Sequence, residues 1–168
     1  EDYIGEAITQ LEHGLQCAHF ATLSEADDEI VLAALFHDVG HFCPDSRGKE
    51  KMGDLGVIDH EGIGARWLNS LGFSNRICEL VKGHVNAKRY LVATNEKYLM
   101  GLSEASLGTL KWQGGPMDAQ EIKKFETDPL FKEKLLIRKF DEMGKVKDLA
   151  VKGLIDYKPM ILKSFQFR

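Results

Sequence analysis

The sequence has no long apolar run, few cysteines and no large excess of charge of either sign. No stretch approaches the roughly 20 apolar residues of a membrane-spanning helix, and the first residues lack the basic and apolar regions of a signal peptide. The 22 basic and 26 acidic residues leave a net charge of −4, which gives no electrostatic case for nucleic acid or an anionic membrane. A small anionic substrate stays possible if a few basic residues converge.

Cysteine is too scarce for a disulfide framework. The three cysteines, Cys17, Cys43 and Cys78, are odd in number and widely spaced, which is typical of reduced thiols in a cytoplasm. We therefore expect a cytoplasmic protein and assign the cysteines no role.

Strand-like alternation of apolar and polar residues is also missing, and the apolar spacing is helical nearly everywhere. With 168 residues and 43% hydrophobic content, the chain can bury the core of one domain over residues 1–168. This predicts a compact all-α fold. Expected helices cover 5–24, 28–40, 59–71, 75–83, 86–93, 103–111, 118–126, 129–143 and 155–165, with a loop over 42–57.

The segment LFHDVGH, residues 35–41, places two histidines and an aspartate on the most apolar expected helix. A buried aspartate is costly unless it is paired, hydrogen-bonded or bound to a metal. The two carboxylate oxygens of Asp38 can bridge two ions while the adjacent His37 binds one of them. His41 follows one turn later and could be a further ligand or an acid or base.

Each histidine taken alone is more often an ordinary, partly buried residue. Five of the six lie in expected helices or at their ends, and several adjoin glycines that allow close packing. This recurrence favours one shared centre. With no cysteine expected near these histidines, the donor set suits iron, manganese, cobalt or zinc. Hydrolysis and oxygen activation both remain open.

The ordered histidines and aspartates resemble those of the HD-domain superfamily, and within it the phosphonate-cleaving, mixed-valent diiron oxygenases of the PhnZ type, relatives of inositol oxygenase. The similarity runs from YIGEAITQLEH (3–13) through LFHDVGH, GHVNAKRYLV (83–92) and SEASLGTLKWQGGPM (103–117) to IRKFDE (137–142). It implies a compact HD-domain helical bundle with two iron ions, Fe(II)/Fe(III), and O2 as co-substrate. The implied ligands are His13, His37, Asp38 and Asp141 for one iron, and His60 and His84 for the other, with Asp38 bridging.

The resemblance also implies substrate contacts. Lys88, one helical turn after His84, and Arg138, one turn before Asp141, would bind the phosphonate together with Ser106 and Thr109. Tyr3 would cap the second iron until substrate arrives, Glu6 would recognise the substrate amine, and His41 would hydrogen-bond the substrate hydroxyl or shuttle its proton, as a near-neutral pKa would allow.

The implied reaction is oxidative cleavage of the carbon–phosphorus bond in a 1-hydroxy-2-aminoethylphosphonate-type substrate, with a primary amine or an N-trimethylated one. The products would be phosphate and glycine or glycine betaine, and a separate hydroxylase would supply the substrate. Three alternatives share the fold: a metal-dependent phosphohydrolase, an inositol-type oxygenase and a regulatory domain without activity.

Overall fold

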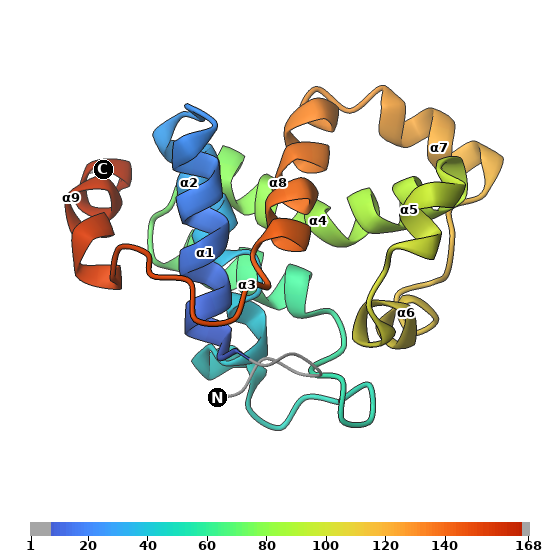
Figure 1. Ribbon diagram of the computed structural model, residues 1–168, viewed down its shortest axis with the longest axis horizontal. Helices are drawn as coiled ribbons and strands as arrows, with labels where there is room; N and C mark the ends of the chain where they lie inside the picture. Colours follow the sequence, from blue (N-terminus) through green and yellow to red (C-terminus); the bar gives the residue numbers. More distant parts are fainter. Residues whose placement is uncertain (1–7, 166–168) are drawn as a thin grey trace.

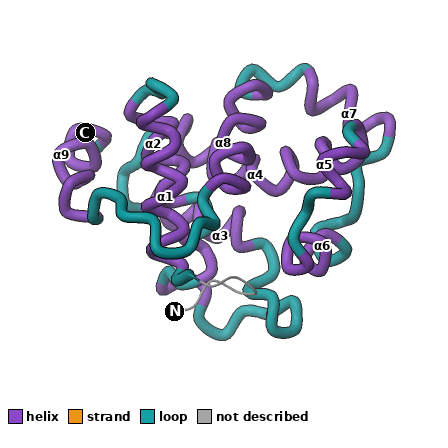
Figure 2. The backbone as a smooth tube through the Cα atoms, in the orientation of Figure 1, coloured by secondary structure: helices purple, strands orange, loops and turns teal. Residues whose placement is uncertain are grey.

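The computed structural model describes residues 8–165, and the chain ends 1–7 and 166–168 lie outside the description. Within the described part the chain is all-α, as predicted, and Figure 2 shows helices joined by loops without a strand. Among residues 8–165, none of the helices combines the length and the apolar content that crossing a membrane requires. The helices are α1 (Gln10–Leu23), α2 (Asp28–Phe36), α3 (His60–Ser70), α4 (Asn75–Thr94), α5 (Glu96–Met100), α6 (Glu104–Leu110), α7 (Ala119–Glu126), α8 (Phe131–Met143) and α9 (Leu154–Ser164).

Helix α2 is the centre of the core and packs against α1, α4, α8 and α9 (Figure 1). Its residues 30–35 are all buried, as expected of a helix that is apolar on every side. The Asp27 side chain caps its first turn by accepting from two backbone N–H groups. The long helix α4 runs from this core to the smaller group of α5, α6 and α7.

The central helix ends earlier than predicted. It stops at Phe36 instead of Gly40, and a short 3₁₀ turn, Val39–His41, follows. The backbone has to leave the α-helix here because Gly40 lies directly against α3. A Cβ atom on Gly40 would overlap the carbonyl oxygen of His60. Asp38 therefore lies in the turn between the two helical segments and not on a helix face.

Other boundaries also differ from the prediction. Helix α4 is continuous where two helices were expected, because Gly83 receives the Lys134 side chain instead of ending the helix. The short α5 was not predicted. Helix α8 begins at Phe131, two residues later than expected.

Replacing Gly40 with alanine should destabilise the protein by more than about 2 kcal/mol, because the added methyl group has to displace backbone of α3. Chemical denaturation of the purified variant measures this. Gly101→Ala is the matched control, since a Cβ atom there meets only ordinary van der Waals neighbours. Equal stability of the two variants would contradict the close contact between the 3₁₀ turn and α3.

Candidate metal centre

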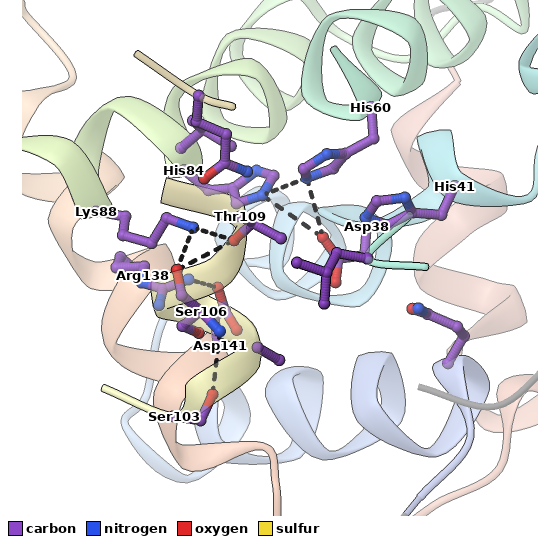
Figure 3. Close-up of a pocket in the computed structure, with 15 residues that line it drawn as sticks. Asp38, His41, His60, His84, Lys88, Ser103, Ser106, Thr109, Arg138 and Asp141 are labelled. Atoms are coloured by element: carbon purple, nitrogen blue, oxygen red, sulfur yellow. Dashed lines mark hydrogen bonds and ion pairs between the residues drawn. The ribbon is translucent and has the colours of Figure 1, made fainter. Parts of the chain in front are cut away.

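The structure brings together all six residues that the sequence predicts as metal ligands. The four histidines and Asp141 come from α1, the end of α2, α3, α4 and α8, and each is at most 4% exposed. Asp38 lies just after α2, and Figure 3 shows it beside His60 and His84. The members are His13, His37, Asp38, His60, His84 and Asp141.

The histidines form two pairs, and Asp38 offers one oxygen to each pair. The Nε2 atoms of His13 and His37 are 3.1 Å apart, and so are those of His60 and His84. Asp38 Oδ2 lies 3.8 and 3.5 Å from the first pair, and Oδ1 lies 3.4 and 3.5 Å from the second. One carboxylate can thus bridge two ions, one at each pair.

Asp141 serves the first pair only. Its Oδ1 atom is 3.4 Å from His13 Nε2 and 3.9 Å from His37 Nε2. This oxygen is buried and has no hydrogen-bond partner among the described residues, while the other carboxylate oxygen pairs with Arg138. A buried carboxylate oxygen without a partner is costly, so a cation at this point would stabilise the arrangement.

Backbone carbonyls orient three of the four rings. The Nδ1–H groups of His13, His37 and His84 donate to the carbonyl oxygens of Gly144, Ala34 and Val81 at 2.8, 2.9 and 2.7 Å. A carbonyl oxygen can only accept, so the proton of each ring lies on Nδ1 and Nε2 is directed to the centre, where it can bind a metal.

The fourth ring, that of His60, differs. Its Nδ1 faces a carboxylate oxygen of Glu61 at 3.5 Å.

The donors fit a metal ion in chemistry and in spacing. Two ligand atoms about 2.1 Å from one ion are roughly 3–3.5 Å apart. This matches all spacings in the second group and most in the first, where the His13–Asp38 and His37–Asp141 distances are longer, at 3.8 and 3.9 Å. A set of imidazoles and carboxylates suits first-row metals such as iron, manganese, cobalt or zinc.

The pKa shifts show that the centre favours positive charge. Burial alone would lower the pKa of His37, but the charges of Asp38 and Asp141 outweigh it and raise that pKa to about 9. Burial likewise favours the neutral form of Asp141, yet Arg138 and the histidines hold its pKa well below the usual value. A metal ion would take the place of the His37 proton.

A wall of hydrogen-bond donors lies beside the second histidine pair. Lys88 Nζ donates to Thr109 Oγ1 at 2.8 Å and to the Ser106 carbonyl at 3.4 Å. Lys88 is only 3% exposed, and burial, together with the charge of Arg138, lowers its pKa to about 7. The four residues predicted to bind a phosphonate thus converge, as Figure 3 shows. We call Lys88, Ser106, Thr109 and Arg138 the anion wall.

Three partners hold Arg138 in place. Its Nε–H donates to Tyr98 Oη at 2.6 Å, and its two terminal nitrogens pair with the carboxylates of Asp141 and Glu142. Lys145 lies beside this group, 3.4 Å from a Glu142 oxygen and 3.5 Å from Ser106 Oγ. The sequence prediction missed these neighbours. Only Glu142, one helical turn after Arg138, gave a signal in the spacing.

A cavity of about 60 Å³ is lined by the anion wall and by part of the metal centre. Asp38, His60, His84 and Asp141 line one part of it and the anion wall another. The remaining lining residues are Gln10, His41, Leu55, Val85, Ser103, Ala105 and Gln113.

His41 lines this cavity, but not with the properties predicted for it. Its ring stacks on that of His60, with the centroids 4.0 Å apart, and its Nδ1 accepts the backbone N–H of Val57 at 3.1 Å. The neutral ring therefore carries its proton on Nε2. Burial and the charge of His60 lower the pKa to about 3. This pKa differs from the near-neutral value that was expected, the Nε2–H group is a hydrogen-bond donor, and the role of His41 at the substrate hydroxyl stays a prediction.

Cys17 corrects a second expectation. The sequence analysis placed no cysteine near the histidines, yet Cys17 Sγ lies 3.8 Å from both ring nitrogens of His13. The contact arises because the two residues are four apart on α1. Burial raises the pKa of the thiol, so it stays protonated and packs as a small apolar group. Tyr3 and Glu6, predicted to act at the second iron and at the substrate amine, lie outside the described residues.

The fold and this centre define a helical domain that can bind metal ions through histidine and aspartate. The chain belongs to the HD-domain family, whose model matches residues 10–142.

Three relatives align with nearly all of the chain. One is the [1-hydroxy-2-(trimethylamino)ethyl]phosphonate dioxygenase (glycine-betaine-forming) of Leisingera caerulea, 42% identical over 96% of this chain and 81% of the relative. The hydroxymethylphosphonate dioxygenase of Gimesia maris is 40% identical over 94% and 78%. An uncharacterized protein of Acanthamoeba polyphaga mimivirus is 40% identical over 96% and 74%.

Metal binding at the first pair should release about one proton near pH 7, because His37 has a pKa of about 9 and a bound ion displaces its proton. As the pH falls below 9, the affinity for Zn²⁺ should fall roughly tenfold per unit. Calorimetric titrations in two buffers of different ionisation enthalpy measure the released protons. Zn²⁺ binding at pH 7 without proton release would contradict this assignment.

Proposed function

We propose that the chain is a diiron oxygenase that uses O2 to cleave the carbon–phosphorus bond of a 1-hydroxyphosphonate. The observation that carries this proposal is the anion wall next to two histidine pairs that share one carboxylate. The two relatives with named activities are phosphonate dioxygenases, which supports oxygenation over hydrolysis. A polyol substrate carries no negative charge that the buried ammonium group of Lys88 could bind.

The overall reaction needs no external reductant. The C1–H and carbon–phosphorus bonds break, a carboxylate forms at C1, and phosphate leaves with a new P–O bond. Both atoms of one O2 molecule are retained in the two products. The bound iron pair would supply the redox chemistry and the site for O2.

The residues of this chain bind and orient the substrate. Lys88 and Arg138 neutralise the phosphonate, and Thr109 and Ser106 can add hydrogen bonds to its oxygens. The Nε2–H of His41 can donate to the C1 hydroxyl oxygen. Burial of Lys88 and Arg138 strengthens their interactions because little water competes. A separate hydroxylation must precede this step, since the substrate already carries a hydroxyl group at C1.

Phosphate release should require O2, and one phosphate should be released for each O2 molecule consumed. The protein is loaded with iron anaerobically, partly oxidised, and given 1-hydroxy-2-aminoethylphosphonate, its N-trimethyl analogue or hydroxymethylphosphonate with and without O2. The control substrate is 2-aminoethyl phosphate, which has a P–O–C linkage that only a hydrolase would cleave. If the phosphonates or the phosphate ester released as much phosphate without O2 as with it, the phosphohydrolase alternative would be established instead.

Anion binding should weaken as the pH rises through about 7, because Lys88 loses its proton there. Sulfate is a suitable competitive inhibitor, since its charge is constant from pH 6.5 to 8.5. Its inhibition constant should rise roughly 25-fold over this range, because the protonated fraction of Lys88 falls by that factor.

The control is Lys88→Arg, whose guanidinium stays protonated throughout. The sulfate inhibition constant of this variant should change much less with pH than that of the wild type. Parallel profiles for the wild type and Lys88→Arg would remove Lys88 from the anion site.

A further inference from the structure

Gln10 is a buried polar residue to which the roles above assign nothing. It lies one helical turn before His13 on α1, is 7% exposed and lines the cavity. Its carbonyl oxygen Oε1 is buried and has no hydrogen-bond partner within residues 8–165. Burying an acceptor without a donor is unfavourable, so this oxygen marks a place where a ligand should supply a donor.

The ligand group that meets Gln10 cannot be the phosphonate. A doubly ionised phosphonate carries only acceptors, which a carbonyl oxygen repels, and the anion wall already offers donors for it. In Figure 3, Lys88, Arg138 and Ser106 lie on one side of the cavity, and Asp38, His60 and His41 on the other. A substrate whose phosphonate is held by the wall and whose C1 faces the histidines must direct its remaining substituent away from the wall.

We propose that Gln10 is a specificity-determining residue whose carbonyl oxygen accepts a hydrogen bond from an ammonium group on the carbon next to C1. This inference rests on the proposed function and narrows its substrate. A primary ammonium has three N–H donors, whereas a trimethylammonium group has none and would leave the buried oxygen without a partner. A site that hydrogen-bonds one substrate group rejects analogues that lack it.

The relatives with named activities offer two substrates for comparison. Hydroxymethylphosphonate has no carbon beyond C1 and therefore no ammonium group that could donate to Gln10. The chain should therefore differ in preference from the relatives named for the trimethylated and hydroxymethyl substrates.

The test compares kcat/KM for 1-hydroxy-2-aminoethylphosphonate, its N-trimethyl analogue and hydroxymethylphosphonate. The wild type should prefer the primary amine over the trimethylated substrate by roughly tenfold or more. Gln10→Met, similar in size but without the acceptor, should lower this ratio at least about fivefold. Dissociation constants of the same compounds, measured by calorimetry without O2, should change in the same direction and do not require turnover.

Gln113→Met is the matched control. Gln113 is the other cavity glutamine with a buried, unpartnered carbonyl oxygen in the described part of the chain, but it lies one turn after Thr109, in the anion wall's own segment. Its replacement should affect all three substrates by a similar factor and preserve the amine preference.

The outcomes distinguish a failure of the role of Gln10 from a failure of the proposed oxygenase function. A wild type that prefers the trimethylated substrate, or a Gln10→Met variant that keeps the wild-type ratio in both binding and turnover, would overturn the role of Gln10. A uniform loss for all three substrates would assign Gln10 to the common C1 hydroxyl or to folding, and would overturn it as well. If no compound yields phosphate with O2, the proposed function fails, while the binding ratios still decide whether Gln10 selects the ammonium group.

Discussion

The position of one carboxylate, Asp38, is the constraint on which the rest of the structure depends. Its two oxygens face two different histidine pairs at 3.4–3.8 Å. This is possible only because the central helix ends at Phe36 and the chain turns before His41. This turn requires a glycine at position 40, because a side chain there would overlap the backbone of α3. The end of a buried apolar helix thus places the Asp38 carboxylate between the two histidine pairs.

The negative charges at the centre are surrounded by groups of positive charge. The carboxylates of Asp141, which is buried, and Asp38, whose side chain is 13% exposed, favour positive charge at the centre. The His37 proton supplies part of this charge, and metal ions can supply the rest. Arg138 joins this centre to the anion wall, since it pairs with Asp141 and also lines the cavity. Arg138 is therefore a common neighbour of the candidate metal centre and the rest of the anion wall, and Tyr98 and Glu142 hold its guanidinium in place.

The fold class and most of the candidate ligands could be predicted from local patterns in the sequence. Helical apolar spacing is a local property, and it located the core helices to within a few residues. The histidines were conspicuous because they recur beside apolar stretches and glycines. Asp141 gave no such signal, because an isolated aspartate late in a helix usually faces water. It could be named only through the resemblance to a known family, and the buried, unpartnered oxygen now gives it a physical reason.

The features that could not be predicted depend on contacts between distant segments. The end of α2 is set by α3, about 20 residues later, and Arg138 is held by Tyr98 from 40 residues earlier. The pKa of His41 was misjudged because its burial and its contact with Val57 follow from the loop path, which composition does not encode. The nearness of Cys17 to His13, by contrast, was readable from their spacing of four and was overlooked.

The central claim is that one carboxylate bridges two metal positions. Counting iron per chain in anaerobically loaded variants tests it most directly. Asp141→Ala should lose the ion at the His13 and His37 pair and keep about one iron per chain, whereas Asp38→Ala should lose both. An Asp38→Ala protein that is folded and still binds two iron ions, as the wild type should, would contradict the account.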